Sequence, residues 1–317
     1  MGMGCWAIGG PFIHPRHGFL AYGQVDDKDS AESVKLGIEL GVTLFDTANV
    51  YGCGRSERVL GEALKDYRSD VVIATKFGST FEISESDSKT PCRAIGRDVS
   101  AEGIIEACDV SLERLQTDYI DLYQLHSGDL EVEMVPDVIE TLEHLVDEGK
   151  IRFYGWSTDD PERAALFADG QHCATVQFGH NMLSHNDDMI ENVIDGRGLS
   201  GLIKGPLGYG LHTGKYKDDS VLPKEHMWHG TKFNEGKVRK VRNALERVRE
   251  IVTNDGRTLA QAALGWIWAE HERLIPIPGF KNSDQVRENA TAMEYGPLSS
   301  KQASEVRGIA AELVESN

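Results

Sequence analysis

The chain has 317 residues, with 33 Lys and Arg against 51 Asp and Glu, so its formal net charge is −18 with histidine neutral. Apolar residues make up 40% and charged residues 26%, a composition typical of globular proteins and not of disordered ones. The length suits one large domain or two modest ones. The acidic balance argues against nucleic acid or an anionic membrane as the main partner, because both require a basic surface.

The sequence contains no apolar run of 18 residues and no charged-then-apolar leader, which predicts a cytoplasmic protein without a membrane span or secretory signal. The five cysteines are odd in number and show no C-x-x-C spacing, so we expect reduced thiols. These cysteines are Cys5, Cys53, Cys92, Cys108 and Cys173.

Short β-branched or aromatic runs alternate with helical patterns along the whole chain. The expected strands are 3–10, 41–48, 70–78, 119–126, 151–157, 174–179, 199–207 and 273–279. The expected helices are 30–41, 56–67, 102–115, 138–150, 161–168, 186–196 and 258–271. Strict alternation implies parallel strands, and eight such units at this length predict an α/β fold, the (β/α)₈ TIM barrel. An open doubly wound sheet is the alternative, but no G-x-G-x-x-G turn follows an early strand.

We expect a single domain over residues 1–317, because no low-complexity linker divides the chain. Two polar stretches, 78–98 and 212–237, are too long for plain connections. Both follow predicted strands, so they belong at the C-terminal face of the barrel, where barrel enzymes keep their chemistry. They are candidate lids.

Reactive side chains follow three consecutive predicted strands. Asp46 ends one strand and Tyr51 follows it by five residues, Lys76 ends the next strand, and His126 ends the third. An ammonium beside a phenol lowers the phenol pKa, and a carboxylate keeps that ammonium charged and oriented. Each residue alone could be structural, as a helix cap, a snorkelling lysine or a core histidine. Four suitable types at neighbouring strand ends favour a proton-donor relay.

Several sequence blocks resemble the aldo-keto reductase superfamily, and together they span nearly the whole chain. They are GVTLFDTANVYGCGRSERVLGEAL, ATKFG, DLYQLHSGD, GWS, VQFGHNML, GPLGYGLHTGKY and IPIPGFKNSDQVRENA. The resemblance implies that Asp46, Tyr51, Lys76 and His126 form a catalytic tetrad, with Tyr51 as general acid. It also implies that the family's N-terminal hairpin is absent, because the chain starts within the first-strand block.

The resemblance further implies a nicotinamide cofactor. The matching positions are Ser157, Thr158, Gln177, Lys204, Pro206, Leu207, Gly208, Gly210, Lys281, Ser283, Gln285, Glu288 and Asn289. Thr158 stands where the family usually has Asn, and Lys204 where many members stack an aromatic ring. A lysine at 281 favours NADPH through the 2′-phosphate, with NAD also possible, since Gln285 replaces a frequent second cation.

The expected function is therefore reduction of aldehyde or ketone carbonyls, or the reverse, with a small-molecule carbonyl or alcohol as substrate. Two alternatives stay open: a cofactor-binding redox-sensing subunit with little turnover, and a barrel lyase that uses Lys76 as a Schiff-base amine. Trp6 and Trp228 are expected at the pocket mouth. The pairs His14-x-x-His17 and His226-x-x-His229 lack a completing ligand, so no metal is expected. The substrate, the reaction direction and the oligomeric state stay open.

Overall fold

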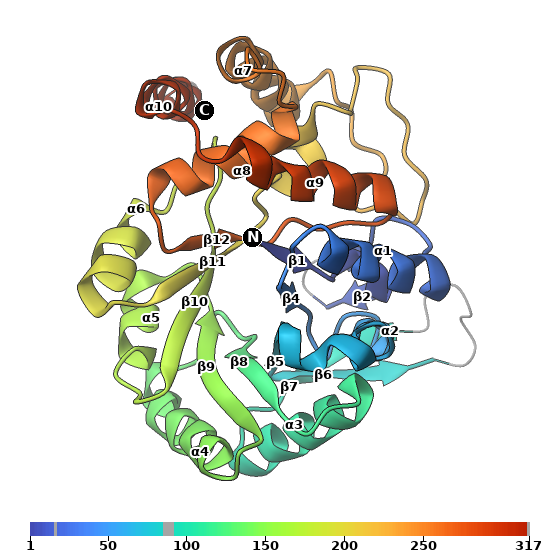
Figure 1. The fold of residues 1–317 in the computed structure, drawn as a ribbon, viewed down its shortest axis with the longest axis vertical. Coiled ribbons are helices and arrows are strands. Elements are labelled where there is room, and N and C mark those ends of the chain that lie inside the picture. Colours follow the sequence, from blue (N-terminus) through green and yellow to red (C-terminus); the bar gives the residue numbers. More distant parts are fainter. Residues whose placement is uncertain (16–17, 85–91, 316–317) are drawn as a thin grey trace.

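The computed structural model describes residues 1–15, 18–84 and 92–315, and its centre is a barrel of parallel strands (Figure 1). The barrel strands in spatial order are β1 (Gly2–Gly4), β4 (Leu44–Asp46), β5 (Val72–Phe77), β8 (Ile120–Leu125), β9 (Ile151–Ser157), β10 (Cys173–Gly179), β11 (Ser200–Lys204) and β12 (Leu274–Pro276). The ring closes where Gly4 bridges Gly279 in parallel and its N–H donates to the Pro278 carbonyl at 3.0 Å. The predicted (β/α)₈ barrel is confirmed.

Helices surround the barrel on its outer side. They are α1 (Asp27–Glu39), α2 (Arg55–Leu64), α3 (Ala101–Leu115), α4 (Val135–Asp147), α5 (Pro161–Phe167), α6 (Asp187–Met189), α7 (Gly236–Val252), α8 (Leu259–Glu270), α9 (Ser283–Tyr295) and α10 (Ser300–Glu315). A π-helical turn over Ile190–Asp195 continues α6. Three helices, α7, α9 and α10, lie outside the set expected from the sequence. Within the described residues, no helix combines the length and apolar character needed to cross a bilayer.

Local sequence explains several helix starts. The Asp160 carboxylate accepts the N–H groups of Glu162 and Arg163, and Pro161 supplies the first residue of α5. Thr258 opens α8 with a reciprocal capping box, in which its hydroxyl and the Gln261 side chain each accept the other's backbone N–H. These caps satisfy donors that the first helical turn leaves without partners.

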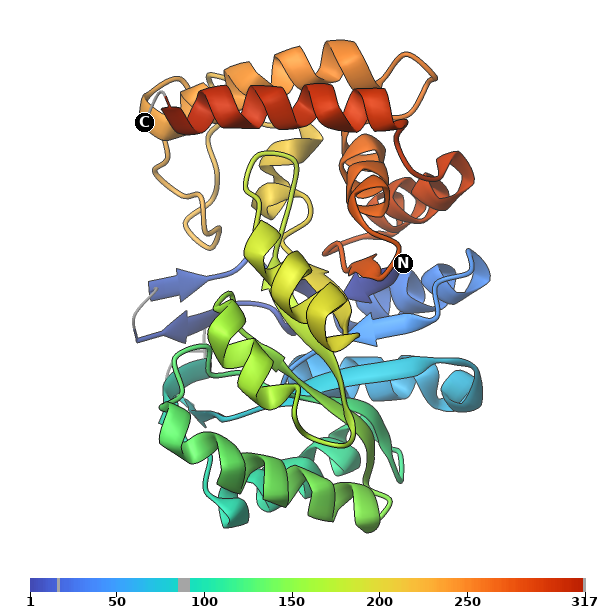
Figure 2. The same ribbon diagram turned by 90° about the vertical axis from the view of Figure 1, so that its left-hand side faces the viewer.

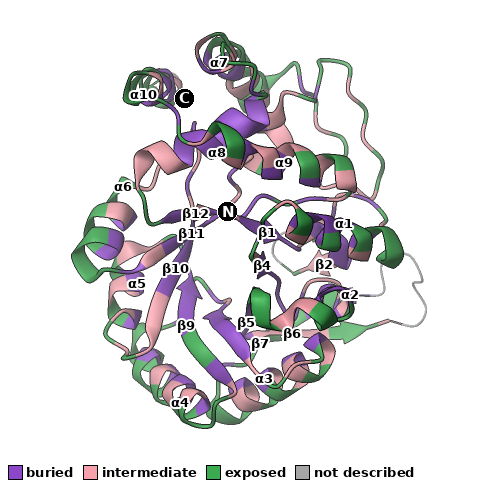
Figure 3. Ribbon diagram, viewed as in Figure 1, coloured by how far each residue is buried: buried purple, intermediate pink, exposed green. Residues whose placement is uncertain are grey.

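The apolar residues of the helical shell form two separate clusters. One packs α1 to α4 onto the strands of the first half of the chain, around Phe45, Phe77 and Trp156. The other packs α7, α8 and α10 onto the second half, around Trp266 and Val248. Figure 2 shows α10 lying along α7 at one end of the molecule, and Figure 3 shows buried barrel strands inside helices with exposed outer faces.

A second sheet lies beside the barrel, and the sequence did not predict it. Its spatial order is β3 (Gly18–Leu20), β2 (Phe12–His14), β7 (Cys92–Arg97) and β6 (Ser79–Ile83). The expected loop 78–98 is therefore largely an antiparallel hairpin, apart from 85–91, which lie outside the described residues. Many side chains of this hairpin are exposed. Its sequence therefore does not show the apolar run of a barrel strand, which is why no strand was predicted there.

The expectation that all cysteines are reduced is wrong for one pair. Cys53 and Cys92 form a disulfide, with their Cα atoms 5.5 Å apart. The fold brings β7 against the turn after β4, and 39 positions separate the two residues in the sequence. No local spacing could reveal that contact. Cys5, Cys108 and Cys173 are free thiols.

The turn after β4 has an unusual backbone. Gly52, Cys53 and Gly54 all have positive φ values, of 60°, 52° and 82°. A Cβ atom at Gly52 would lie 2.0 Å from the Gly9 carbonyl oxygen, so this position requires glycine for space as well as for conformation. The close approach fixes the turn against the segment that follows β1.

We expect Gly52→Ala to lower the free energy of unfolding by about 3 kcal/mol or more, because a left-handed conformation with a Cβ costs about 1–2 kcal/mol and the overlap adds to that cost. Urea denaturation followed by circular dichroism measures the difference. Gly41→Ala is the matched control, since Gly41 also has a positive φ, of 85°, but an added Cβ would meet nothing within 4 Å. Equal losses in the two variants would contradict the close approach.

Candidate active site

A buried ion pair lies where β4 and β5 end inside the barrel. The Lys76 Nζ donates to Asp46 Oδ2 at 2.6 Å and to the Thr47 carbonyl at 2.7 Å. The Lys76 side chain is 0% exposed and that of Asp46 is 4% exposed. The structure thus brings together two of the residues that the sequence singled out.

Two amides complete the surroundings of the Asp46 carboxylate. Gln124 of β8 and Gln177 of β10 donate their Nε2 groups to Oδ1, at 3.1 and 2.7 Å. Both oxygens of the carboxylate are therefore engaged, which is how a buried charge is retained. Since the Gln177 nitrogen is committed to Asp46, its carbonyl oxygen is the atom left for a ligand.

Tyr51 lies beside this pair at the floor of a cleft. Its ring centroid is 5.1 Å from Lys76 Nζ and 5.9 Å from the His126 ring, in an edge-on arrangement. Burial raises the pKa of Tyr51 well above 10.0, and the negative charge of Asp46 adds to the rise. The lowering expected from Lys76 is not found, because burial and the Asp46 charge dominate. The phenol therefore keeps its proton.

His126 follows β8 and faces the same floor. Burial, with help from the charges of Lys76 and Lys204, lowers its pKa well below 6.5. Its Nδ1 atom is buried without a hydrogen-bond partner. A neutral imidazole carries one N–H donor, so His126 can hydrogen-bond an oxygen of a bound molecule without carrying charge.

The cleft above these residues encloses about 1580 Å³. Its walls include Trp6 and most of the predicted cofactor positions, which are Ser157, Thr158, Gln177, Lys204, Pro206, Leu207, Gly210, Lys281, Gln285, Glu288 and Asn289. Both long polar stretches also contribute, through residues such as Arg97 and His226. A cleft of this size can hold a dinucleotide together with a small substrate.

Besides the fully buried Lys76, three predicted residues lie outside the lining of this cleft. The Ser283 hydroxyl is 3.2 Å from that of Ser33, between α9 and α1. Trp228 donates its ring N–H to the Tyr209 carbonyl at 3.0 Å. Gly208 donates its backbone N–H to the Gly205 carbonyl within the turn after β11. Their predicted roles at a ligand stay predictions.

The two departures from the family pattern have partners within the protein. The Thr158 hydroxyl donates to the Gly128 carbonyl at 3.2 Å and accepts the Asp160 N–H, so it stabilises the turn after β9. Lys204 forms an ion pair with Asp159 at 3.1 Å. The cleft wall at Lys204 thus carries opposite charges side by side.

Sequence reasoning missed two basic residues that line the far end of the cleft with Lys281, namely Lys215 and His226. The Lys281 Nζ donates to the Tyr22 carbonyl at 3.0 Å, and Tyr22 in turn forms a backbone bridge with His226. Burial lowers the pKa of Lys215; the negative charge of Glu288 opposes this shift, and the charge of Lys281 adds to it. Burial and both lysines likewise lower the pKa of His226.

Neither Lys215 nor Lys281 forms an ion pair with a carboxylate among the described residues. Lys76, Arg97 and Lys204 each form one. Glu288 of the same cleft acts on Lys215 electrostatically but forms no ion pair with it. Two ammonium groups that line one cleft without ion-pair partners attract an anion, and a phosphate suits them. The sequence does contain an indication of Lys215, because this lysine lies in the HTGKY block, just after the glycine-rich turn that follows β11.

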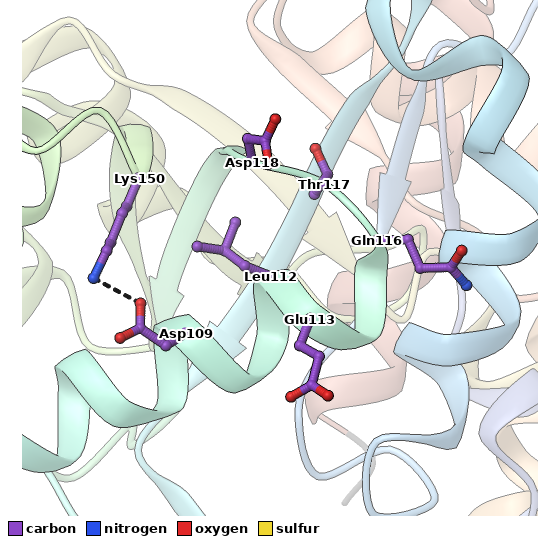
Figure 4. Close-up of a pocket in the computed structure, with 7 residues that line it drawn as sticks. All are labelled: Asp109, Leu112, Glu113, Gln116, Thr117, Asp118 and Lys150. Atoms are coloured by element: carbon purple, nitrogen blue, oxygen red, sulfur yellow. Dashed lines mark ion pairs between the residues drawn. The ribbon is translucent and has the colours of Figure 1, made fainter.

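A second hollow, of about 490 Å³, lies at the opposite end of the barrel, where β8 and β9 begin (Figure 4). Its only lining cation is Lys150, which pairs with Asp109 at 2.7 Å and with Glu148. The hollow contains no group positioned for catalysis or for binding an anion.

A group of possible metal ligands lies outside the cleft, at His180, Asp187 and Glu270. Arg307 of α10 already forms ion pairs with both carboxylates, and Asn186 donates its N–H to His180 Nδ1. The carboxylates therefore have a cationic partner from the protein itself. Of the histidine pairs noted in the sequence, His17 lies outside the described residues.

Comparison with known proteins agrees with this geometry. The model of the Aldo/keto reductase family matches residues 1–311. Aldo-keto reductase YhdN of Bacillus subtilis is 31% identical over 294 residues, covering 90% of this chain and 82% of that protein. The NADH-specific methylglyoxal reductase of Escherichia coli is 30% identical over 321 residues, covering 98% and 94%. The chain therefore belongs to the aldo/keto reductase family, and it is an oxidoreductase.

Comparison with solved structures also finds members of the aldo-keto reductase family. The glycerol dehydrogenase AKR11B4 from Gluconobacter oxydans has a TM-score of 0.82 at 26% identity, covering 99% of this chain and 91% of that one. An aldo-keto reductase from Klebsiella pneumoniae in complex with NADPH has a TM-score of 0.68 at 26% identity, covering 98% and 90%.

The directions of the pKa shifts of Tyr51 and His126 predict how these two groups titrate. Because burial raises the pKa of Tyr51 above 10.0 and lowers that of His126 below 6.5, neither group changes charge between these two pH values. Ultraviolet difference spectra of wild type against Tyr51→Phe should show no phenolate from Tyr51 below pH 10. Ionisation of Tyr51 between pH 7 and 9 would mean that Lys76 dominates after all.

Proposed function

We propose that the chain reduces small aldehydes or ketones to alcohols, or catalyses the reverse reaction, with NADPH as its preferred cofactor. The observation that carries the proposal is the grouping of Tyr51, His126 and the Asp46–Lys76 pair at one end of a cleft. The unpaired Lys215 and Lys281 at the other end match the charge of a phosphate-bearing nucleotide.

The residues of the cleft fit a nicotinamide dinucleotide. When bound, NADPH supplies a hydride. The Gln177 carbonyl oxygen and the Ser157 hydroxyl are the groups that would hold its carboxamide, and Lys215 and Lys281 would hold phosphate. The similar proteins differ in cofactor, since one is named NADH-specific and another is solved with NADPH. The two lysines without ion-pair partners, Lys215 and Lys281, are our reason for NADPH.

The proton chemistry uses groups of this chain alone. The neutral His126 donates a hydrogen bond to the carbonyl oxygen and so orients the carbonyl carbon. Tyr51 gives its proton to the same oxygen as negative charge develops there, and the nearby Lys76 ammonium stabilises the phenolate that remains. Asp46 keeps the ammonium charged and in place. In alcohol oxidation the same groups act in reverse.

The Schiff-base alternative is disfavoured by the geometry of Lys76. An imine requires the Nζ atom to reach a substrate carbonyl, but Lys76 is fully buried and uses two N–H groups on Asp46 and Thr47. Burial does lower the pKa of Lys76. However, the carboxylate at 2.6 Å favours its charged form, which is not a nucleophile. The redox-sensing alternative requires the same cofactor site and differs from the proposed carbonyl reductase only in having little turnover.

We expect Tyr51→Phe to bind NADPH with unchanged affinity and to lose about 10²–10⁴-fold in kcat, because only the proton donor is removed. Quenching of tryptophan fluorescence measures binding, and NADPH absorbance measures turnover of 4-nitrobenzaldehyde. Retained turnover would overturn the role of Tyr51. Wild-type protein that binds NADPH but reduces no carbonyl in a broad panel would favour the redox-sensing alternative.

Lys215→Met and Lys281→Met should each weaken NADPH binding by about 10–100-fold, since a hydrogen bond to a charged group contributes about 1.5–3 kcal/mol. We expect the variant that contacts the 2′-phosphate to leave NADH affinity unchanged. Lys217→Met is the control, because Lys217 is exposed and does not line the cleft. Equal losses for NADH and NADPH in both variants would contradict the preference for NADPH.

A further inference from the structure

The Cys53–Cys92 disulfide joins two walls of the active-site cleft. Cys53 lies two residues after Tyr51, in the turn that leads into α2. Cys92 is the first residue of β7, and three later residues of that strand, Ile95, Gly96 and Arg97, line the cleft. The bond therefore connects the segment that carries the proton donor to the wall near the substrate end. The catalytic chemistry proposed above does not use it.

The surroundings of the pair accommodate two thiols as well as a disulfide. Cys53 Sγ lies 3.5 Å from the Glu82 carbonyl oxygen, and Cys92 Sγ lies 3.8 Å from that of Val50. After reduction, each thiol has a carbonyl within reach to accept its S–H group, so neither sulfur becomes a buried donor without a partner. The small apolar cluster around the pair, which includes Phe12 and Ala94, suits both states.

The backbone at Cys53 makes this turn sensitive to the loss of the bond. Cys53 has a φ of 52°, a left-handed conformation that is unfavourable for a residue with a Cβ. The disulfide is one of the constraints that hold the residue there. Val50 contacts the pair directly, and its neighbour Tyr51 carries the reactive phenol. Release of Cys53 therefore acts on the segment that positions the donor.

Among the described residues, the hairpin that bears Cys92 contacts its surroundings through a small set of interactions besides the disulfide. Two residue pairs connect β7 to β2, Phe12 with Cys92 and Ile13 with Arg93, and Ala94 packs in the apolar cluster with Phe12. The Asn49 side chain donates to the Ser79 carbonyl at 3.0 Å. At the far end, Arg97 donates to the Ser127 hydroxyl at 3.2 Å and pairs with exposed carboxylates, which contribute little because solvent screens them. The disulfide adds a covalent tie to these contacts.

We propose that Cys53 and Cys92 form a reversible oxidation site, through which low-molecular-weight disulfides control the substrate end of the cleft. In the forward step, one cysteine thiolate attacks the small disulfide and releases one small thiol. The second cysteine then attacks the mixed disulfide and releases the other thiol. The two protein thiols lose two electrons, the small disulfide gains them, and the protons leave on the two small thiols. Because both sulfurs are at most 2% exposed, exchange requires the hairpin to open and is slow.

The first experiment measures the oxidation state itself. Full-length protein is equilibrated with mixtures of reduced and oxidised glutathione, denatured in iodoacetamide, and mapped by mass spectrometry. We expect Cys53 and Cys92 to become protected together as the oxidised fraction rises, while Cys5, Cys108 and Cys173 are alkylated throughout. Alkylation of all five cysteines in every mixture would overturn the proposal.

The second experiment compares the two states in function. We expect the KM for 4-nitrobenzaldehyde to rise about three- to tenfold on reduction, a change of about 0.7–1.4 kcal/mol in free energy. NADPH affinity should stay unchanged, because Lys215 and Lys281 lie at the other end of the cleft. Cys92→Ser should show the KM of the reduced protein under all conditions. Cys173→Ser, which removes a free thiol elsewhere, should respond as wild type does.

Hydrogen exchange makes the test independent of the proposed carbonyl reduction. Residues 49–52 and 93–97 should exchange faster in the reduced protein than in the oxidised one. If the protein reduces no carbonyl but shows this difference, the proposed function fails and the oxidation site stands. Equal exchange and equal KM in the two states would show that the bond does not control the cleft.

Discussion

The buried ion pair between Asp46 and Lys76 is the interaction on which the active site depends. A lone charge buried inside a barrel would be expelled to solvent or neutralised by a proton. Here each buried charge is balanced by the opposite charge of its partner. The ion pair connects β4 to β5 directly. The amides of Gln124 and Gln177 connect the Asp46 carboxylate to β8 and β10. One carboxylate thus links four strands, so the polar layer of the barrel interior is stable only as a complete network.

This network also explains why Tyr51 and His126 differ so strongly from free side chains. Burial is the main cause of both shifts, the charge of Asp46 adds to the rise for Tyr51, and the charges of Lys76 and Lys204 add to the fall for His126. A neutral phenol and a neutral imidazole are both hydrogen-bond donors. Two neutral donors therefore face the floor of the cleft, and the cations Lys215 and Lys281 line the same cleft.

Much of this arrangement could be predicted from the sequence, because its signals are local. The β9 strand has the predicted bounds of 151–157, and the grouping of Asp46, Tyr51, Lys76 and His126 was predicted from residue types at and after strand ends. The disulfide could not be predicted, since it depends on how a polar hairpin folds back across 39 positions. The helix α7 left a signal that was missed, with Val241, Leu245, Val248 and Val252 at helical spacing. The direction of the Tyr51 pKa shift could not be predicted, because it depends on how deeply the fold buries the phenol.

The division of the helical shell into two apolar clusters has a mechanical consequence for the cleft. The elements that carry Tyr51, Lys76 and His126 pack in the first cluster, whereas Lys215 precedes α7, a helix of the second. Lys281, however, follows Phe280, which packs with α9 in the first cluster. The two lysines that line the cleft are therefore anchored in different clusters. A substitution that loosens the packing of the second cluster acts on Lys215, while Lys281 and the Asp46–Lys76 pair keep their own support.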